Sequence, residues 1–151
     1  MPRTQLEGRF VPSLANFPVL EIASPSVVHY DCVSIPSYFE CIDRGLAMQT
    51  RFAILHDARA LPHVDDLRRQ EFQALLAPRR AEVIKHVVAY ASVVASPLER
   101  GILTAFKWFI KLPFPIHLFT SEAEARSWLL SRVKAAREAD LASTAAPITQ
   151  G

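Results

Sequence analysis

The sequence has little cysteine and little glycine. Its 151 residues include only two cysteines, Cys32 and Cys41, and four glycines. Two thiols outside a C-x-x-C pair make neither a disulfide framework nor a complete zinc site, which favours a reducing compartment. Phosphate-binding loops of the G-x-G-x-x-G or G-x-x-x-x-G-K type are absent, and so is the G-x-S-x-G motif. The sequence therefore excludes a P-loop nucleotidase and gives little support for nucleophilic catalysis.

The chain also lacks a long hydrophobic run and an excess of one charge. Its longest charge-free apolar stretch, residues 87–98, is too short to span ~30 Å of hydrocarbon. Residues 1–17 contain no apolar signal core. The formal net charge of +2 does not indicate a dedicated nucleic-acid binder. Half of the residues are apolar, enough to bury a core. We expect a soluble, cytoplasmic single domain with no transmembrane segment.

Strand-like and helix-like segments alternate along the chain. In chain order, the predicted strands are residues 18–24, 27–34, 51–58, 87–95 and 115–121, and the predicted helices are residues 37–50, 64–86, 97–112 and 122–137. The first two strands read as a hairpin joined by a Ser-Pro-Ser turn, and Pro78 should kink or split the second helix. The order ββαβαβαβα requires crossover connections, which predicts an α/β fold with a mostly parallel sheet.

The two ends of the chain differ from the middle in composition. Residues 1–16 show no clear period, and we interpret them as a poorly ordered or loosely docked arm. Residues 139–151 are small, polar and proline-containing, which is typical of a disordered tail. The predicted domain is therefore residues 17–138.

Four passages give the chain a family resemblance. They are FAILHDARAL, VVAYASVVASPLERGILTAFKW, FPIHLFTS and EAEARSWL, within residues 19–135. In these passages the chain resembles the STAS-like (SpoIIAA-like) family of small bacterial domains. The resemblance implies one layer of about five strands in a mixed sheet, with about four helices packed mainly on one face. It also implies a partner-binding switch module and does not imply an enzyme. We expect no cofactor.

The family's switch depends on a hydroxyl residue where the second helix starts, and this chain departs from that pattern. The loop reads HDARALPHVDDL, in which Asp57 matches the aspartate that ends the strand and Arg59 stands where the loop serine would be. Asp66 falls at or beside the position that a kinase would phosphorylate. A carboxylate suits the positive end of a helix but cannot be phosphorylated. The departure favours fixed partner binding over a phosphorylation switch.

One polar cluster could carry chemistry. It consists of His56, Asp57, His63, Asp65 and Asp66, placed where strand-to-helix loops gather at the carboxyl edge of a parallel sheet. Such a set could hold a divalent metal or act as a general acid and base. Neighbours on a strand point to opposite faces, however, so His56 and Asp57 should not act together. Capping carboxylates and a loop histidine explain the cluster better, and we assign no metal site and no catalytic residue.

The segment 96–115 is rich in both aromatic and basic residues. Ser96 and Glu99 form a capping box with Pro97 at the first helical position, and prolines end the helix near residue 112. An apolar stripe follows helical spacing, and Trp108 lies outside it among the basic residues. Three interpretations stay open: a core helix, an interaction surface for a protein partner or a second copy, and one wall of a lipid or other apolar-ligand site.

The leading hypothesis is a non-enzymatic regulatory or scaffold module that binds a protein partner and that could form a homodimer. Its predicted partner surface consists of Asp65, Asp66, Arg69, Arg100, Lys107, Trp108 and Lys111. The competing hypothesis is a binder of a small apolar molecule or lipid, in a pocket between the third predicted helix and the sheet. That pocket would be lined by Ile102, Phe106, Phe109 and Tyr90. An enzyme using His56, Asp57 and His63 is the third hypothesis.

Overall fold

The strands of the protein form one mixed sheet. The computed structural model describes residues 8–26, 33–60, 66–95 and 112–145. Within them the sheet order is β1-β2-β3-β4-β5, with β1 antiparallel to β2 and each later pair parallel. The strands are β1 (Val11–Ser13), β2 (Val19–Ala23), β3 (Phe52–Asp57), β4 (Val87–Val93) and β5 (Ile116–Phe119). The predicted α/β class with a five-stranded mixed sheet is confirmed.

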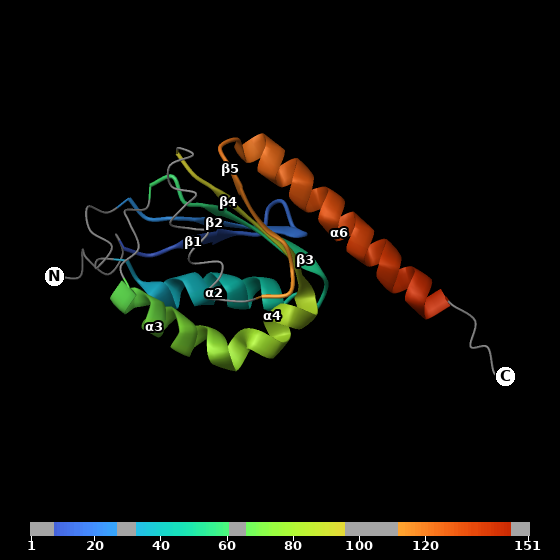
Figure 1. Ribbon diagram of the computed structural model, residues 1–151, viewed down its shortest axis with the longest axis horizontal. Helices are drawn as coiled ribbons and strands as arrows, with labels where there is room; N and C mark the ends of the chain where they lie inside the picture. The colour runs from blue at the N-terminus through green and yellow to red at the C-terminus, as the bar shows by residue number, and fades with distance from the viewer. Residues whose placement is uncertain (1–7, 27–32, 61–65, 96–111, 146–151) are drawn as a thin grey trace.

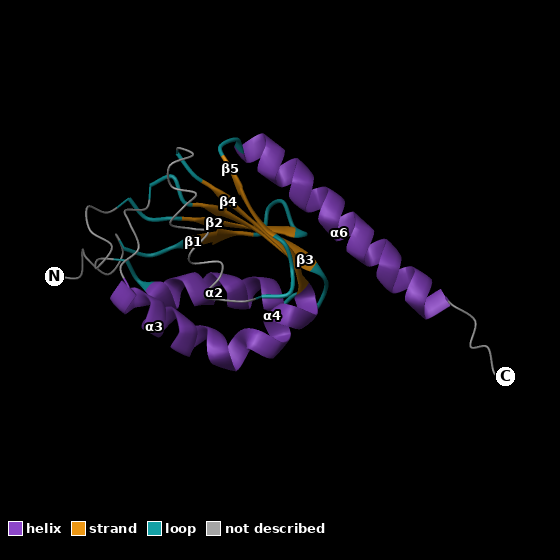
Figure 2. Ribbon diagram, in the orientation of Figure 1, coloured by secondary structure: helices purple, strands orange, loops and turns teal. Residues whose placement is uncertain are grey.

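Helices cover both faces of the sheet. They are α2 (Ile35–Leu46), α3 (Asp66–Leu76), the short 3₁₀ turn η2 (Ala77–Arg79), α4 (Arg80–His86) and α6 (Glu122–Ala145). Figures 1 and 2 show α2, α3 and α4 beneath the sheet and α6 across its opposite face. The helix predicted at 97–112 lies outside the described residues, so the full order ββαβαβαβα stays a prediction. None of the described helices combines the length and the apolar character needed to cross a membrane.

The strand order explains this division of the helices. Strands β2 to β5 follow one another across the sheet, and right-handed crossovers then place the connecting helices on the same face. Helix α6 follows the last strand and makes no crossover, so it is free to cover the second face. The described helices therefore lie mainly on one face, as predicted, and α6 adds a second core on the opposite face that the sequence analysis did not predict.

Local signals in the sequence account for the ends of the helices. Ser34 caps α2 and accepts a hydrogen bond from the backbone N–H of Ser37 at 3.3 Å. Pro78 ends the regular pattern of the second predicted helix, which divides into α3, η2 and α4 as expected. Within α4, Val83 is buried in the core, whereas its neighbour Ile84 is 40% exposed.

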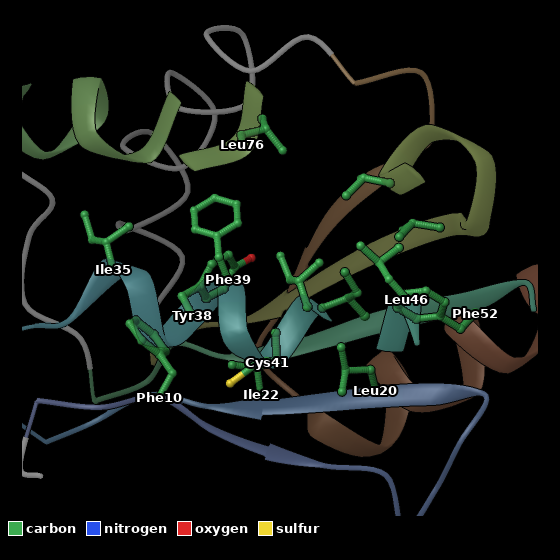
Figure 3. Packing of buried hydrophobic residues seen from close by; sticks show 14 of the residues in the cluster. Phe10, Leu20, Ile22, Ile35, Tyr38, Phe39, Cys41, Leu46, Phe52 and Leu76 are labelled. Carbon is green, nitrogen blue, oxygen red and sulfur yellow. The ribbon is translucent and has the colours of Figure 1, made fainter. Parts of the chain in front are cut away.

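The sheet separates two hydrophobic cores. Alternate strand residues point to opposite faces, so Leu20, Ile22, Phe52 and Ile54 pack with α2 on one side. Figure 3 shows this cluster, in which Phe39 of α2 lies above the strands. On the other side, small strand residues meet α6. This second core consists of Val19, Ala53, Leu55, Ala89, Ala91 and Val93 with Ala125, Leu129 and Val133 of α6.

Two of the predicted boundaries are wrong at the ends of the domain. Residues 1–16 were expected to be a loose arm, but Phe10 is buried in the core and Val11–Ser13 form strand β1, the antiparallel neighbour of β2. The predicted hairpin between residues 18–24 and 27–34 is also wrong, because β1 and β3 occupy the two sides of β2; residues 27–32 lie outside the described residues. At the other end, α6 continues past residue 139 to Ala145, and an ion pair between Arg51 and Asp140 holds it to the start of β3.

Gly45 allows α2 to approach β3, and this generates a prediction for stability. A Cβ atom at position 45 would lie 2.6 Å from Cε2 of Phe52, much closer than van der Waals contact. Alanine is otherwise better than glycine in a helix by ~1 kcal/mol, but this overlap should cost about 1–3 kcal/mol. We expect Gly45→Ala to lower the melting temperature and the free energy of unfolding measured in urea.

A double-mutant cycle isolates the cause of that loss. Phe52→Leu removes the ring atoms that the new methyl group would meet, so Gly45→Ala should cost less in the Phe52→Leu background than in the wild type. Equal costs in both backgrounds would show that the contact with Phe52 is not the reason for the glycine.

Candidate functional site

Most residues of the predicted partner surface lie outside the described parts of the chain. Asp65, Arg100, Lys107, Trp108 and Lys111 lie outside the described residues. Asp66 and Arg69 belong to the first turns of α3, but their side chains are not described. The partner surface therefore stays a prediction. Of the predicted pocket residues, Ile102, Phe106 and Phe109 also lie outside the described residues, and Tyr90 alone can be placed.

The His56–Asp57 pair divides between the two faces, as predicted. Both lie at the carboxyl end of β3, where His56 faces α2 and Asp57 faces the side covered by α6. His63 and Asp65 lie outside the described residues, so the predicted cluster stays a prediction. Among the described residues, no three histidine, cysteine or carboxylate side chains are grouped in a way that would hold a metal ion.

His56 is the centre of a chain of hydrogen bonds between elements that are distant in sequence. Its Nε2 lies 2.6 Å from Oγ of Ser24, just after β2, and its Nδ1 lies 2.9 Å from the hydroxyl of Tyr90 in β4. The Tyr90 hydroxyl is in turn 2.7 Å from the hydroxyl of Tyr38 in α2. The chain therefore joins two strands, a strand-to-helix loop and a helix on one side of the sheet.

Burial keeps the His56 imidazole neutral. The side chain is enclosed by the rings of Phe10, Tyr38 and Tyr90, whose centroids lie 5.6, 5.5 and 6.3 Å from its own. Loss of solvation lowers the pKa of His56 from 6.5 to about 4, against a weaker opposite effect of Asp57. At neutral pH the ring thus has one N–H donor and one acceptor nitrogen.

The hydrogen-bond chain can run in either of two directions. If Nδ1 carries the proton, it donates to Tyr90, Tyr90 donates to Tyr38, and Ser24 donates to Nε2. If Nε2 carries the proton, each of these bonds reverses. Ser24 is half-buried, so the end of the chain nearest to solvent can present either a donor or an acceptor.

Ser92 adds a hydroxyl with an unmet hydrogen-bonding requirement. It pairs with His56 in the register of β3 and β4, so both side chains lie on the same face of the sheet. Ser92 is 2% exposed, and its Oγ makes no hydrogen bond with any of the described residues. A buried hydroxyl without a partner costs ~1–3 kcal/mol and calls for an explanation. We define the His56 site as Ser24, Tyr38, His56, Tyr90 and Ser92.

The opposite face of the same edge carries a network of ion pairs. Arg59 binds Asp57 through Nε and Nη2 at 2.9 and 2.7 Å and reaches Glu122 at 3.3 Å. Glu122 also binds Arg126, which binds Glu21 of β2. Hydrogen bonding from Arg59 lowers the pKa of the Asp57 carboxyl. These ion pairs link the start of α6 to the sheet. Asp57 pairs with Arg59 on the face of the sheet opposite to His56.

Cys41 is a small buried residue of the core on the α2 side. It is 1% exposed within α2, and burial raises the pKa of its thiol to about 11. The thiol therefore stays protonated at neutral pH, which makes it a poor nucleophile. Cys32 lies outside the described residues.

Sequence reasoning missed three members of the His56 site, namely Ser24, Tyr38 and Ser92. They belong to no local motif, because they lie in a loop, a helix and a strand. The one available signal was the polar pair Tyr90 and Ser92 inside a strand that is otherwise apolar and buried on both faces. Polar groups in such a strand require partners.

Comparisons of the chain with protein-family models, with curated proteins and with solved structures return no match.

The neutral state of His56 predicts how stability depends on pH. The unfolded chain binds a proton at His56 with a pKa near 6.5 and the folded protein only near 4. The unfolded state therefore binds more protons between these values, and stability should fall as the pH decreases from about 6.5 toward 4. We expect urea unfolding at pH 7 and pH 5 to show this loss of stability, and His56→Gln to reduce it.

His117→Gln is the control, because it changes an exposed histidine, and it should leave the loss of stability unchanged. An unchanged pH dependence in His56→Gln would contradict the lowered pKa of His56.

Proposed function

We propose that the chain is a non-catalytic binding module of the STAS-like kind, and that its His56 site binds a small, neutral, largely apolar molecule through one hydrogen-bonding group. The mixed five-stranded sheet supports the family proposal. The position of α6 on the second face departs from the one-sided layer that the resemblance implies. This ligand-binding role develops the second of the functions expected from the sequence.

The observation that carries the proposal is the unbonded hydroxyl of Ser92 beside the neutral His56. Together with Ser24 they stand at the carboxyl ends of adjacent parallel strands, where α/β proteins commonly bind ligands. Aromatic rings surround the imidazole, and small-molecule sites typically combine apolar walls with a few polar groups. A ligand hydroxyl or carbonyl would supply the partner that Ser92 lacks.

The charge state of the site supports binding of a neutral group rather than catalysis. A base whose pKa is about 4 accepts a proton poorly at neutral pH. The nearest carboxylate in sequence, Asp57, is on the other face and held by Arg59, so its effect on the pKa of His56 is weaker than that of burial. Burying a charged ligand group against hydroxyls and a neutral imidazole would cost more than burying a neutral one.

Binding of a protein partner stays a prediction from the sequence, as do a homodimer and a cytoplasmic location. The surface proposed for a partner includes Trp108 and its basic neighbours, which lie outside the described residues. The predicted partner residues lie either at the start of α3 or after β4. None of them belongs to the His56 site, so the two binding functions are compatible.

Replacement of Ser92 by alanine tests the proposed function through opposite effects on stability and binding. Ser92→Ala removes the unbonded hydroxyl, so ligand-stripped protein should be as stable as the wild type or more stable by about 1 kcal/mol in urea unfolding. Native mass spectrometry of gently purified wild-type protein should show a retained small molecule. The Ser92→Ala protein should retain much less of it.

Ser127→Ala is the matched control, since Ser127 is exposed on α6 and belongs to no site described here. It should retain the small molecule at the wild-type level. A wild-type protein that carries no small molecule after gentle purification, or a Ser92→Ala protein that retains as much as the wild type, would argue against ligand binding at this site.

A further inference from the structure

An open groove lies at the amino-terminal edge of the sheet, opposite to the edge that holds the His56 site. Its volume is about 350 Å³, which is near the lower end of the range of ~300–1,000 Å³ for small-molecule sites. The walls come from the start of β4, from α4, from α6 and from residues 113–115 before β5. Every one of the lining residues belongs to the described parts of the chain.

Apolar residues form one wall of the groove. Val88 and Phe114 are half-buried and pack against the two cores, and Ile84 of α4 is 40% exposed beside them. Pro113 and Pro115 add apolar surface without a backbone N–H. The exposed side chain of Ile84 thus adds apolar surface to this groove.

Two arginines lie at the groove, and only one is neutralised. Arg51 forms a two-pronged ion pair with Asp140, at 3.1 and 3.2 Å. Arg132 forms no ion pair with any carboxylate of the described residues; its guanidinium carbon lies 6.0 Å from the ring centroid of Trp128. Arg137, one to two turns further along α6, donates to the backbone oxygen of Arg51 at 3.1 Å, also without a carboxylate partner in this part of the chain. The groove therefore combines an apolar wall with an excess of positive charge.

We propose that this groove binds a medium-chain fatty acid, with the alkyl chain against Ile84, Val88 and Phe114 and the carboxylate at Arg132. The charge favours a carboxylate head, because the guanidinium of Arg132 can donate two parallel hydrogen bonds to its oxygens. The limited volume favours a single chain of medium length. The site is separate from the His56 site in both place and chemistry, and it does not depend on the proposed function.

A pair of matched probes tests the groove with the full-length protein. Octanoate and octan-1-ol have the same chain length and differ in the charge of the head group, and heteronuclear NMR titrations measure the affinity for each. Arg132→Gln should weaken octanoate binding by about threefold to tenfold and leave octan-1-ol binding unchanged. Ile84→Gln should weaken both probes, and added salt should weaken octanoate alone.

Lys134→Gln is the control for loss of charge, since Lys134 is exposed on α6, does not line the groove and lies on another side of the helix from Arg132. It should bind octanoate as the wild type does. Equal losses in Arg132→Gln and Lys134→Gln would indicate general electrostatic attraction and overturn the proposal. So would an absence of octanoate binding by the wild-type protein.

Two other occupants of the groove, a membrane surface and a second copy of the chain, would give different experimental results. In sedimentation with phosphatidylserine vesicles, we expect the protein not to bind. If the wild-type protein binds the vesicles but not monomeric octanoate, and Arg132→Gln abolishes vesicle binding, the groove binds a membrane surface instead. Size-exclusion chromatography should show no dimer that depends on Ile84. A dimer that Ile84→Gln separates would make the groove an interface between two copies and would overturn the fatty-acid proposal.

Discussion

The structure depends on the burial of β3 and β4 on both faces of the sheet. Large side chains of these strands pack toward α2, and smaller ones pack toward α6, so most residues of both strands are buried. Every polar side chain placed on them must then find a partner within the protein or in something bound to it. This requirement turns His56 into a neutral hydrogen-bonding centre, and it makes the unbonded hydroxyl of Ser92 informative.

The difference in side-chain size between the two faces positions α6. One side of the sheet has short side chains at Ala53, Ala89 and Ala91, and Ala125 of α6 packs against them. Such small residues allow a helix and a sheet to approach closely and pack without voids. Ion pairs then fix both ends of α6: Arg126 with Glu21 near its start, and Asp140 with Arg51 near its end.

These anchors give the two edges of the sheet different chemistry. At the carboxyl edge, the carboxylates and arginines pair with one another on the α6 side, whereas the His56 site on the α2 side consists of a neutral imidazole and hydroxyl groups. At the amino edge, Asp140 neutralises Arg51, whereas Arg132 lies beside the ring of Trp128 and pairs with no carboxylate of the described residues. One edge therefore suits a neutral hydrogen-bonding group, and the other suits an anionic amphiphile.

The sequence by itself determined the elements whose signals are local. Periodicity and β-branched runs located β2, β3, β4, β5, α2 and the start of α6, and Pro78 located the break between α3 and α4. Tertiary structure decided the rest, because sheet register and helix placement bring together residues that no local pattern links. Strand β1 is three residues long and is defined only by its pairing with β2. Ser24 and Tyr90 lie 32 and 34 residues from His56 and meet it only across the sheet. Burial on both faces, which is a property of the assembled layers, is what made that histidine neutral.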